Sequence, residues 1–450
     1  MEKKMVVDYA HEKWEKKFGT DAAYEKWDKK NKSKGTDNYF DTESRAKKSY
    51  LKGLKGRVQN NLSGLLRVVV TALIVLLQIL LILILPFLLR SITVYFYFIL
   101  ELCSIIAIVT LVNKKQSPSF RIAWISIVLL LPISGFVLYY LWGREGGKKK
   151  QLDEHILRQI SYGQNFLIQD GKIAEEYVEK HPVAGRMVKY MISEGFPLTA
   201  GNDVKYYPMG EDAFEDIIEA LEQAKEYIFI DFFIVAEGAL WDQIHKILKR
   251  KLEEGVEVKF LYDDFGAAIR TQKFFKQILE HEGMEVRVFN PIHKYTGELY
   301  MNYRSHQKIL VVDGEVGFTG EYANLIERFG VWKDTGVRLK GEAVWNLTVV
   351  FLQMWEASAF EKEHIDYLRY KKLPDKAGDT YCQVIADGPA FNPNNSIESV
   401  YNQMITFADE YLYITTPYLV LEDYMQQSLI EAVHRGVDVR ILTPYIPDKK

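Results

Sequence analysis

The chain has 450 residues, which is long enough for two or three domains. Its net charge of -3 gives no general basis for binding nucleic acid, and its two cysteines exclude both a disulfide framework and a zinc site built on Cys. Residues 1–66 form a polar, Lys-rich arm in which a Lys-Trp-acidic-Lys-Lys pattern begins at Lys13 and again at Lys26. Two interpretations of this arm are open. It is attracted to anionic lipid headgroups, where each basic residue gains about 1 kcal/mol, or it is a solvated tail without a role.

Three apolar runs follow the arm, at residues 68–89, 92–112 and 122–142. The first has the length that a bilayer core of about 30 Å requires, and the third ends in aromatic residues typical of a membrane interface. The first run begins too late in the chain for a cleavable signal peptide. We therefore predict transmembrane segments within residues 67–143 and a multi-pass protein of the cell membrane.

Basic residues flank the three runs on both sides and leave the membrane topology open. Lys52, Lys55 and Arg57 precede the first run, and residues 148–150 are three lysines that follow the third. The positive-inside rule places both flanks in the cytoplasm, although three crossings would put them on opposite sides. Either one segment is re-entrant, or one basic flank lies on the side opposite to the one that the positive-inside rule predicts. We expect a cytoplasmic C-terminal domain, because that part is larger and carries the chemistry.

Residues 144–195 have the composition of a charged linker with helical periodicity. From about Val204, helix and strand patterns alternate along the chain. Such alternation predicts an α/β fold with a parallel or mixed sheet covered by helices on both faces. The predicted helices are 213–225, 241–254 and 274–281, and the predicted strands are 227–235, 256–262 and 285–289.

The most informative segment is the octad that runs from His306 to Asp313. Residues 309–312 are aliphatic, and Asp313-Gly314 is a strong signal for a two-residue β-hairpin turn. Side chains alternate along a strand, so His306 and Lys308 leave the same face. An imidazole nucleophile beside an ammonium that attracts phosphate suits chemistry on a phosphodiester. The alternative is an ordinary amphipathic hairpin with an Asp-Gly turn.

An internal repeat divides the α/β region into two copies. Residues 224–230 (Ala-Lys-Glu-Tyr-Ile-Phe-Ile) match residues 408–414 (Ala-Asp-Glu-Tyr-Leu-Tyr-Ile). Each is followed by a helix and then by a Gly-Val-acidic-Val strand, which starts at Gly255 in one copy and at Gly436 in the other. Two copies of one unit predict a pseudo-twofold arrangement with the active site between them. The His of the second copy would fall beyond Lys450, so we expect an incomplete second unit.

With these motifs, residues 68–450 resemble bacterial cardiolipin synthases of the phospholipase D superfamily. The resemblance rests on the HxKxxxxD motif at His306, Lys308 and Asp313 and on further matches in the same order, at residues 117–124, 261–266, 332–341, 351–355 and 443–448. It implies phosphatidylglycerol as the substrate. It also implies a first phospholipase D-like domain at residues 196–372 and a truncated second one at 380–450, both behind the membrane segments.

The resemblance further implies a mechanism. In that family, one His of two facing motifs attacks phosphorus to form a phosphohistidine, and the other protonates the leaving alkoxide. Here His306 would be the nucleophile, Lys308 would bind the phosphate, and Asp313 would orient the imidazole. The resemblance implies no metal and no cofactor.

Two departures from the family pattern bear on the function. The Gly-Gly-x-Asn run of the family is missing after Gly320, so Asn324 would seat the phosphate only if this loop changes register; a second HxKxxxxD motif is absent from residues 1–450. The leading hypothesis is a phosphatidyltransferase of cardiolipin synthase type, inactive alone if the second motif is missing. A hydrolase of the same superfamily and a degenerate protein that binds anionic membrane are the alternatives. The expected partners are a second copy or a full-length paralogue, and no nucleic acid.

Overall fold

The computed structural model describes residues 93–113, 118–139, 143, 147–236, 238–267, 271, 274–291, 303–321, 334–359, 364–372, 376–388, 390 and 395–444, with scattered residues between 72 and 84. The predicted N-terminal arm and most of the first apolar run lie outside these residues.

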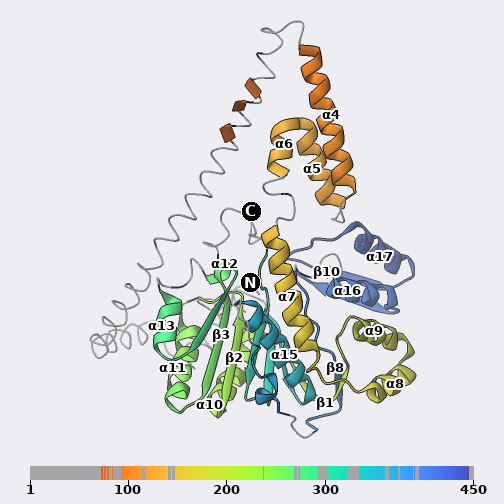
Figure 1. The fold of residues 1–450 in the computed structure, drawn as a ribbon. Coiled ribbons are helices and arrows are strands. Elements are labelled where there is room, and N and C mark those ends of the chain that lie inside the picture. Colours follow the sequence, from red (N-terminus) through yellow and green to blue (C-terminus); the bar gives the residue numbers. More distant parts are fainter. Residues whose placement is uncertain are drawn as a thin grey trace, which may run out of the picture.

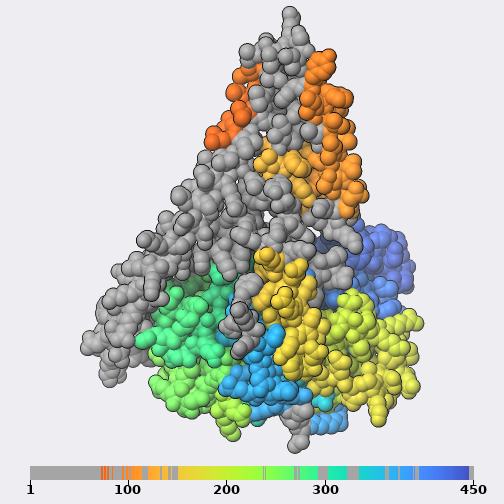
Figure 2. All heavy atoms as spheres, viewed as in Figure 1, coloured from red at the N-terminus to blue at the C-terminus, as the bar shows by residue number. Residues whose placement is uncertain are grey.

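The second and third apolar runs form helices α4 (Thr93–Val112), α5 (Pro118–Leu130) and α6 (Pro132–Leu138). Pro132 separates α5 from α6, because a proline disfavours helical backbone at the residue before it. Helix α4 projects beyond the sheet-containing body (Figures 1 and 2) and exposes apolar side chains such as Val94, Phe98 and Ile105. Across the described residues, no helix has both the length and the apolar character needed to span a bilayer. The predicted membrane spans stay predictions.

The centre of the fold is an eight-stranded mixed sheet with strand order β4-β3-β2-β5-β6-β7-β1-β8. Strands β2, β3 and β4 are parallel to one another, and every other neighbouring pair is antiparallel. The strands are β1 (Thr199–Tyr207), β2 (Tyr227–Phe232), β3 (Glu257–Asp263), β4 (Glu285–Phe289), β5 (Lys308–Val312), β6 (Val316–Gly320), β7 (Gly336–Lys340) and β8 (Thr380–Cys382).

Helices cover both faces of this sheet (Figure 1). Helices α10 (Gly210–Gln223), α11 (Ala239–Glu253) and α13 (Phe275–His281) pack on one face, and α7 (Gly147–Gln164) and α15 (Glu342–Ala357) pack on the other. Alternation along β2 serves both layers, because Ile228 and Ile230 enter the first core while Tyr227 and Phe229 enter the second. The predicted α/β fold is confirmed, with small shifts at the ends of the helices and strands.

Residues 144–195, which were predicted as a linker, contain three helices. Helix α7 packs along α15, and it is followed by α8 (Gly171–Lys180) and α9 (Pro182–Ser193). Two short elements lie further along the chain, α12 (Asp264–Ala267) and the 3-10 helix at Tyr367–Tyr370. The predicted domain boundaries remain predictions.

The C-terminal unit repeats the start of the large sheet. It has two parallel strands, β9 (Tyr411–Thr415) and β10 (Asp438–Leu442), with helices α16 (Ser396–Phe407) and α17 (Asp423–His434). The N–H of Asp438 donates to the carbonyl of Glu410, just as the N–H of Glu257 donates to that of Glu226. Gly255 and Gly436 precede these strands with φ of 90° and 94°, the left-handed conformation that favours glycine at a helix end. The internal repeat is therefore present in the fold.

Candidate active site

The structure brings His306 and Lys308 together at the start of β5. Strand β5 runs antiparallel to β2, with Lys308 opposite Phe232. Lys308 is only 6% exposed, whereas His306 is open to solvent. The Lys308 Nζ lies 2.9 Å from the Nδ1 of His306. An accessible imidazole is thus held beside a largely buried ammonium.

The Lys308 ammonium lies near both nitrogens of the imidazole, at 2.9 Å from Nδ1 and 3.4 Å from Nε2. When the Lys308 ammonium donates to Nδ1, the neutral ring carries its proton on Nε2. The opposite face of the site is apolar, because the ring of Phe233 packs against His306 with centroids 4.6 Å apart.

Carboxylates surround the Lys308 ammonium. Glu321 follows β6, is half exposed, and places Oε1 2.8 Å from Lys308 Nζ. Burial lowers the pKa of Lys308, although its ion pair with Glu321 opposes that shift. Burial and the charge of Glu321 raise the pKa of Asp334, which precedes β7, to about 6. The site therefore places the buried ammonium of Lys308 among acidic side chains.

Asp313 lies at the other end of β5, roughly 16 Å from Lys308 at about 3.3 Å per residue. Its carboxylate accepts hydrogen bonds from the backbone N–H groups of Lys225, Glu226 and Tyr227, at 2.7, 2.8 and 2.8 Å. The predicted role of Asp313 in orienting His306 is wrong, because the strand separates the two side chains. Asp313 instead ties the β5–β6 turn to the start of β2.

Two family models match parts of the chain. Residues 217–355 match the family described as cardiolipin synthase, PLD-like domain, and residues 102–144 match the phospholipase D-nuclease N-terminal family. An uncharacterized protein of Streptococcus mutans is 36% identical over 352 residues, which cover 76% of this chain and 75% of that protein. A cardiolipin synthase of Listeria monocytogenes is 30% identical over 356 residues, which cover 76% of this chain and 73% of that protein. Another cardiolipin synthase, from Geobacillus kaustophilus, is 30% identical over 365 residues, which cover 78% of this chain and 71% of that protein.

The chain belongs to the cardiolipin synthase family. The resemblance inferred from the HxKxxxxD motif is thereby confirmed.

Two buried acids of this cardiolipin synthase family member are not among the site residues predicted from the motif. Asp231 on β2 and Asp263 at the end of β3 are both fully buried. Burial and the charge of Asp263 raise the pKa of Asp231 well above its ordinary range, while Lys308 lowers it. Neither carboxylate oxygen of Asp231 has a hydrogen-bond partner within the described parts of the chain. The available signal was a single acid inside an otherwise apolar strand, where charged residues are rarely buried.

Asp263 fixes the segment that leads into the motif. Its Oδ2 accepts from the backbone N–H of Ser305 at 3.0 Å, and its Oδ1 accepts from that of Phe265 at 2.8 Å. Arg304 lies 3.3 Å from the same carboxylate. Burial raises the pKa of Asp263 to about 6, although Arg304 and the backbone hydrogen bonds lower it. These contacts hold the backbone immediately before His306.

The remaining predicted site residue, Asn324, lies outside the described residues, so its role in seating phosphate stays a prediction. Among the residues that the structure describes, no three His, Cys, Asp or Glu side chains are grouped so as to hold a metal ion.

Proposed function

We propose that this protein is a membrane-bound phosphatidyltransferase that converts two phosphatidylglycerols to cardiolipin and glycerol. The observation that supports the proposal is the contact of the accessible His306 imidazole with the buried Lys308 ammonium at 2.9 Å. A nucleophile and a fixed positive charge at that spacing suit attack on a phosphodiester. Membership of the cardiolipin synthase family supports the same substrate class.

In the proposed first step, Nε2 of His306 attacks the phosphorus of one phosphatidylglycerol. The P–N bond forms, the bond from phosphorus to the headgroup glycerol breaks, and the glycerol leaves with a proton from an opposing acid. Lys308 stabilises the charge on the phosphoryl oxygens. In the second step, a headgroup hydroxyl of another phosphatidylglycerol attacks phosphorus and loses its proton to the same opposing group. The P–N bond then breaks and cardiolipin is released.

The opposing acid is the part of this reaction that His306 does not supply. Residues 1–450 contain one HxKxxxxD motif. We therefore propose that a second HxKxxxxD segment faces His306, carried by another copy, by a full-length paralogue or by chain beyond residue 450. In the same proposal, Asn324 contacts the phosphate.

We further propose that residues 67–143 hold the catalytic domain at the cytoplasmic face of the cell membrane. The apolar side chains that α4 exposes, among them Val94, Phe98 and Ile105, would then contact lipid. Extraction of membranes with alkaline carbonate tests this part, because an inserted protein stays in the pellet. Release of the chain into the supernatant would contradict it.

The test of the enzymatic proposal is incubation of the purified protein with labelled phosphatidylglycerol, alone and with a paralogue whose own nucleophilic His is replaced. We expect labelled cardiolipin and an acid-labile phosphoryl adduct, both lost in His306→Ala. Phosphatidate as the main product would favour the hydrolase. Absence of product and adduct in both mixtures would favour a degenerate membrane-binding protein.

A further inference from the structure

A narrow, mainly apolar pocket opens beside His306, on the face of the sheet that α7 and α15 cover. Ile156 and Ile160 of α7 form one wall, and Val350 and Met354 of α15 form another. The segment after β8 closes the pocket with residues 384, 386–388 and 390. The site of the proposed phosphate chemistry therefore continues into apolar space.

Two polar atoms that line this pocket have no hydrogen-bond partner among the described residues. Ser305 and Gln307 flank His306 in the sequence and line the pocket. The Oγ of Ser305 and the Oε1 of Gln307 are buried and have no hydrogen-bond partner within the part of the chain that is described. Burying such an atom unpaired costs about 1–3 kcal/mol, and most buried polar atoms in native structures are paired. The two atoms indicate a ligand that brings its own polar groups to the pocket.

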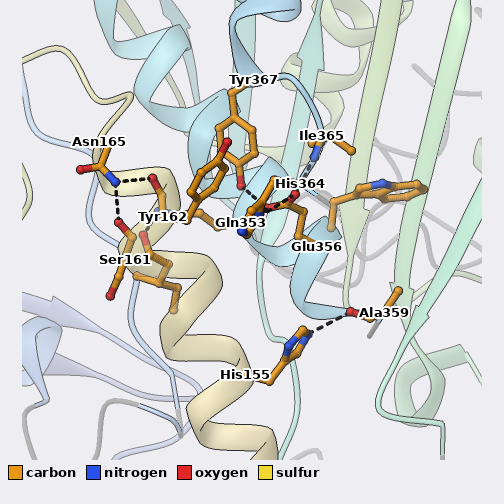
Figure 3. A network of polar contacts seen from close by, with 12 residues as sticks. His155, Ser161, Tyr162, Asn165, Gln353, Glu356, Ala359, His364, Ile365 and Tyr367 are labelled. Atoms are coloured by element: carbon orange, nitrogen blue, oxygen red, sulfur yellow. Dashed lines mark hydrogen bonds and ion pairs between the residues drawn. The ribbon is translucent and has the colours of Figure 1, made fainter. Parts of the chain in front are cut away.

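The wall formed by α7 is firmly attached to the catalytic domain. The Nε2 of Gln353 donates to the carbonyl of Ile160 at 2.8 Å. The ring of His155 faces the carbonyl oxygen of Ala359 (Figure 3), and the two groups lie 2.9 Å apart. The rings of Tyr162 and His364 stack with centroids 3.7 Å apart. The pocket is therefore a fixed part of the fold and not a gap between loosely packed helices.

The position of α7 in the chain relates the pocket to the third apolar run. The helix starts at Gly147, a few residues after the third apolar run ends at residue 142. One pocket wall thus continues from the segment that we propose lies in the membrane. The pocket therefore lies close in the chain to that segment.

We infer that this pocket binds one acyl chain of the phospholipid whose phosphate is held at His306 and Lys308. The inference rests on the function proposed above and specifies how the substrate is placed. A phosphatidylglycerol has ester carbonyls that accept from the Ser305 hydroxyl and headgroup hydroxyls that donate to Gln307 Oε1. Its acyl chain then lies between α7 and α15, where it leaves water.

Gly388 is a pocket-lining position where a larger side chain can be added at little structural cost. It lines the pocket, and a Cβ placed on it meets no other atom within 4 Å. Gly388→Leu should therefore fold like the native chain. The matched control is Gly171→Leu at the start of α8, where a Cβ also meets nothing within 4 Å and which does not line the pocket.

For Gly388→Leu we expect kcat/KM with dioleoyl phosphatidylglycerol to fall about tenfold or more. With the dihexanoyl lipid, whose chains are too short to fill the pocket, kcat/KM should stay unchanged. Gly171→Leu should leave both values unchanged. Equal losses on both lipids, or no loss on either, would overturn the inference.

A second readout separates this inference from the proposed reaction. Phosphatidylglycerol with a photoreactive diazirine near the end of one acyl chain is added to vesicles that contain the full chain. We expect the label on peptides of α7 and α15, reduced in Gly388→Leu and unchanged in Gly171→Leu. Label that is absent from both helices, or insensitive to Gly388→Leu, would reject the pocket even if cardiolipin forms. If the pocket is labelled but no phosphatidylglycerol reacts, the proposed reaction fails and the binding site stands.

Discussion

The carboxylate of Glu321 lies 2.8 Å from the ammonium of Lys308, so an acid of the chain itself is paired with the proposed phosphate-binding cation. Lys308 is largely buried, whereas Glu321 is half exposed and follows directly on β6. A phosphate that reaches Lys308 must therefore displace the Glu321 carboxylate or bind despite its charge. We therefore expect this ion pair to weaken anion binding at the site.

Replacing Glu321 with Gln should strengthen anion binding. An ion pair with one exposed partner contributes up to about 1 kcal/mol, which corresponds to about fivefold in affinity. We expect inorganic vanadate to bind Glu321→Gln about fivefold more tightly in isothermal titration calorimetry. Glu315→Gln is the control, because that exposed acid pairs with Lys372 at the β5–β6 turn. Weaker binding by Glu321→Gln would show instead that Glu321 holds Lys308 in its binding position.

Replacing Asp313 with Asn should lower stability and leave anion binding intact. The carboxylate accepts three backbone hydrogen bonds, and the amide would present an N–H group to at least one of those donors. Hydrogen bonds to charged groups contribute about 1.5–3 kcal/mol, so the unfolding free energy should fall by about 2–3 kcal/mol. In detergent micelles we expect a melting temperature several degrees lower. A loss of vanadate affinity at an unchanged melting temperature would restore a role for Asp313 at His306.

The parts of the fold that were predictable depend on neighbours in sequence. Continuous apolar runs indicated β2 and β5, and Asp313-Gly314 indicated the turn that joins β5 to β6, where both residues have positive φ. The repeat indicated that Gly255 and Gly436 end equivalent helices. Each of these features is determined within a few residues, so pattern and turn chemistry suffice.

The roles of the acids were not predictable in the same way. The carboxylate of Asp313 is satisfied by backbone at Lys225–Tyr227, and this contact exists only because β5 pairs with β2. Asp231 resembles sheet core in the sequence, and its place near Lys308 follows from the same pairing. A side-chain role that depends on which strands pair cannot be predicted from local sequence patterns. The family resemblance gave the motif but not the distance between its ends.

Asp231 should make the stability of the fold depend on pH. Burial raises its folded pKa well above the unfolded value of about 3.9. The folded state therefore binds the proton more tightly, and its stability falls as pH rises from about 4 through the folded pKa. Asp231→Asn cannot lose a proton and should escape this loss.

We expect Asp231→Asn to have a higher melting temperature than the native chain. This increase in melting temperature should be larger at pH 8 than at pH 5. The difference between the two pH values measures the free-energy cost of ionising Asp231 in the folded state. The exposed acid Asp409 provides the control, since Asp409→Asn should shift the melting temperature equally at both pH values. An equal shift for Asp231→Asn as well would reject the pH dependence.

The attachment of α7 to α15 depends on the absence of a side chain at Gly163. A Cβ at this position would overlap the Cγ of Gln353, whose Nε2 donates to the Ile160 carbonyl at 2.8 Å. Alanine in place of a helical glycine gains about 1 kcal/mol in helix propensity. Overpacking costs about 1–3 kcal/mol and the lost hydrogen bond about 1 kcal/mol more. The steric cost is larger, so Gly163→Ala should loosen α7.

Hydrogen–deuterium exchange measures this loosening directly. In Gly163→Ala we expect the amides of α7 to exchange faster, while those of α10 on the opposite face of the sheet stay unchanged. Gly171→Ala is the matched control, because its Cβ meets no atom within 4 Å and should not alter exchange in α7. Slower exchange in the α7 of Gly163→Ala would mean that helix propensity outweighs the contact with Gln353. In that case the hydrogen bond to Ile160 would not be what holds this helix against α15.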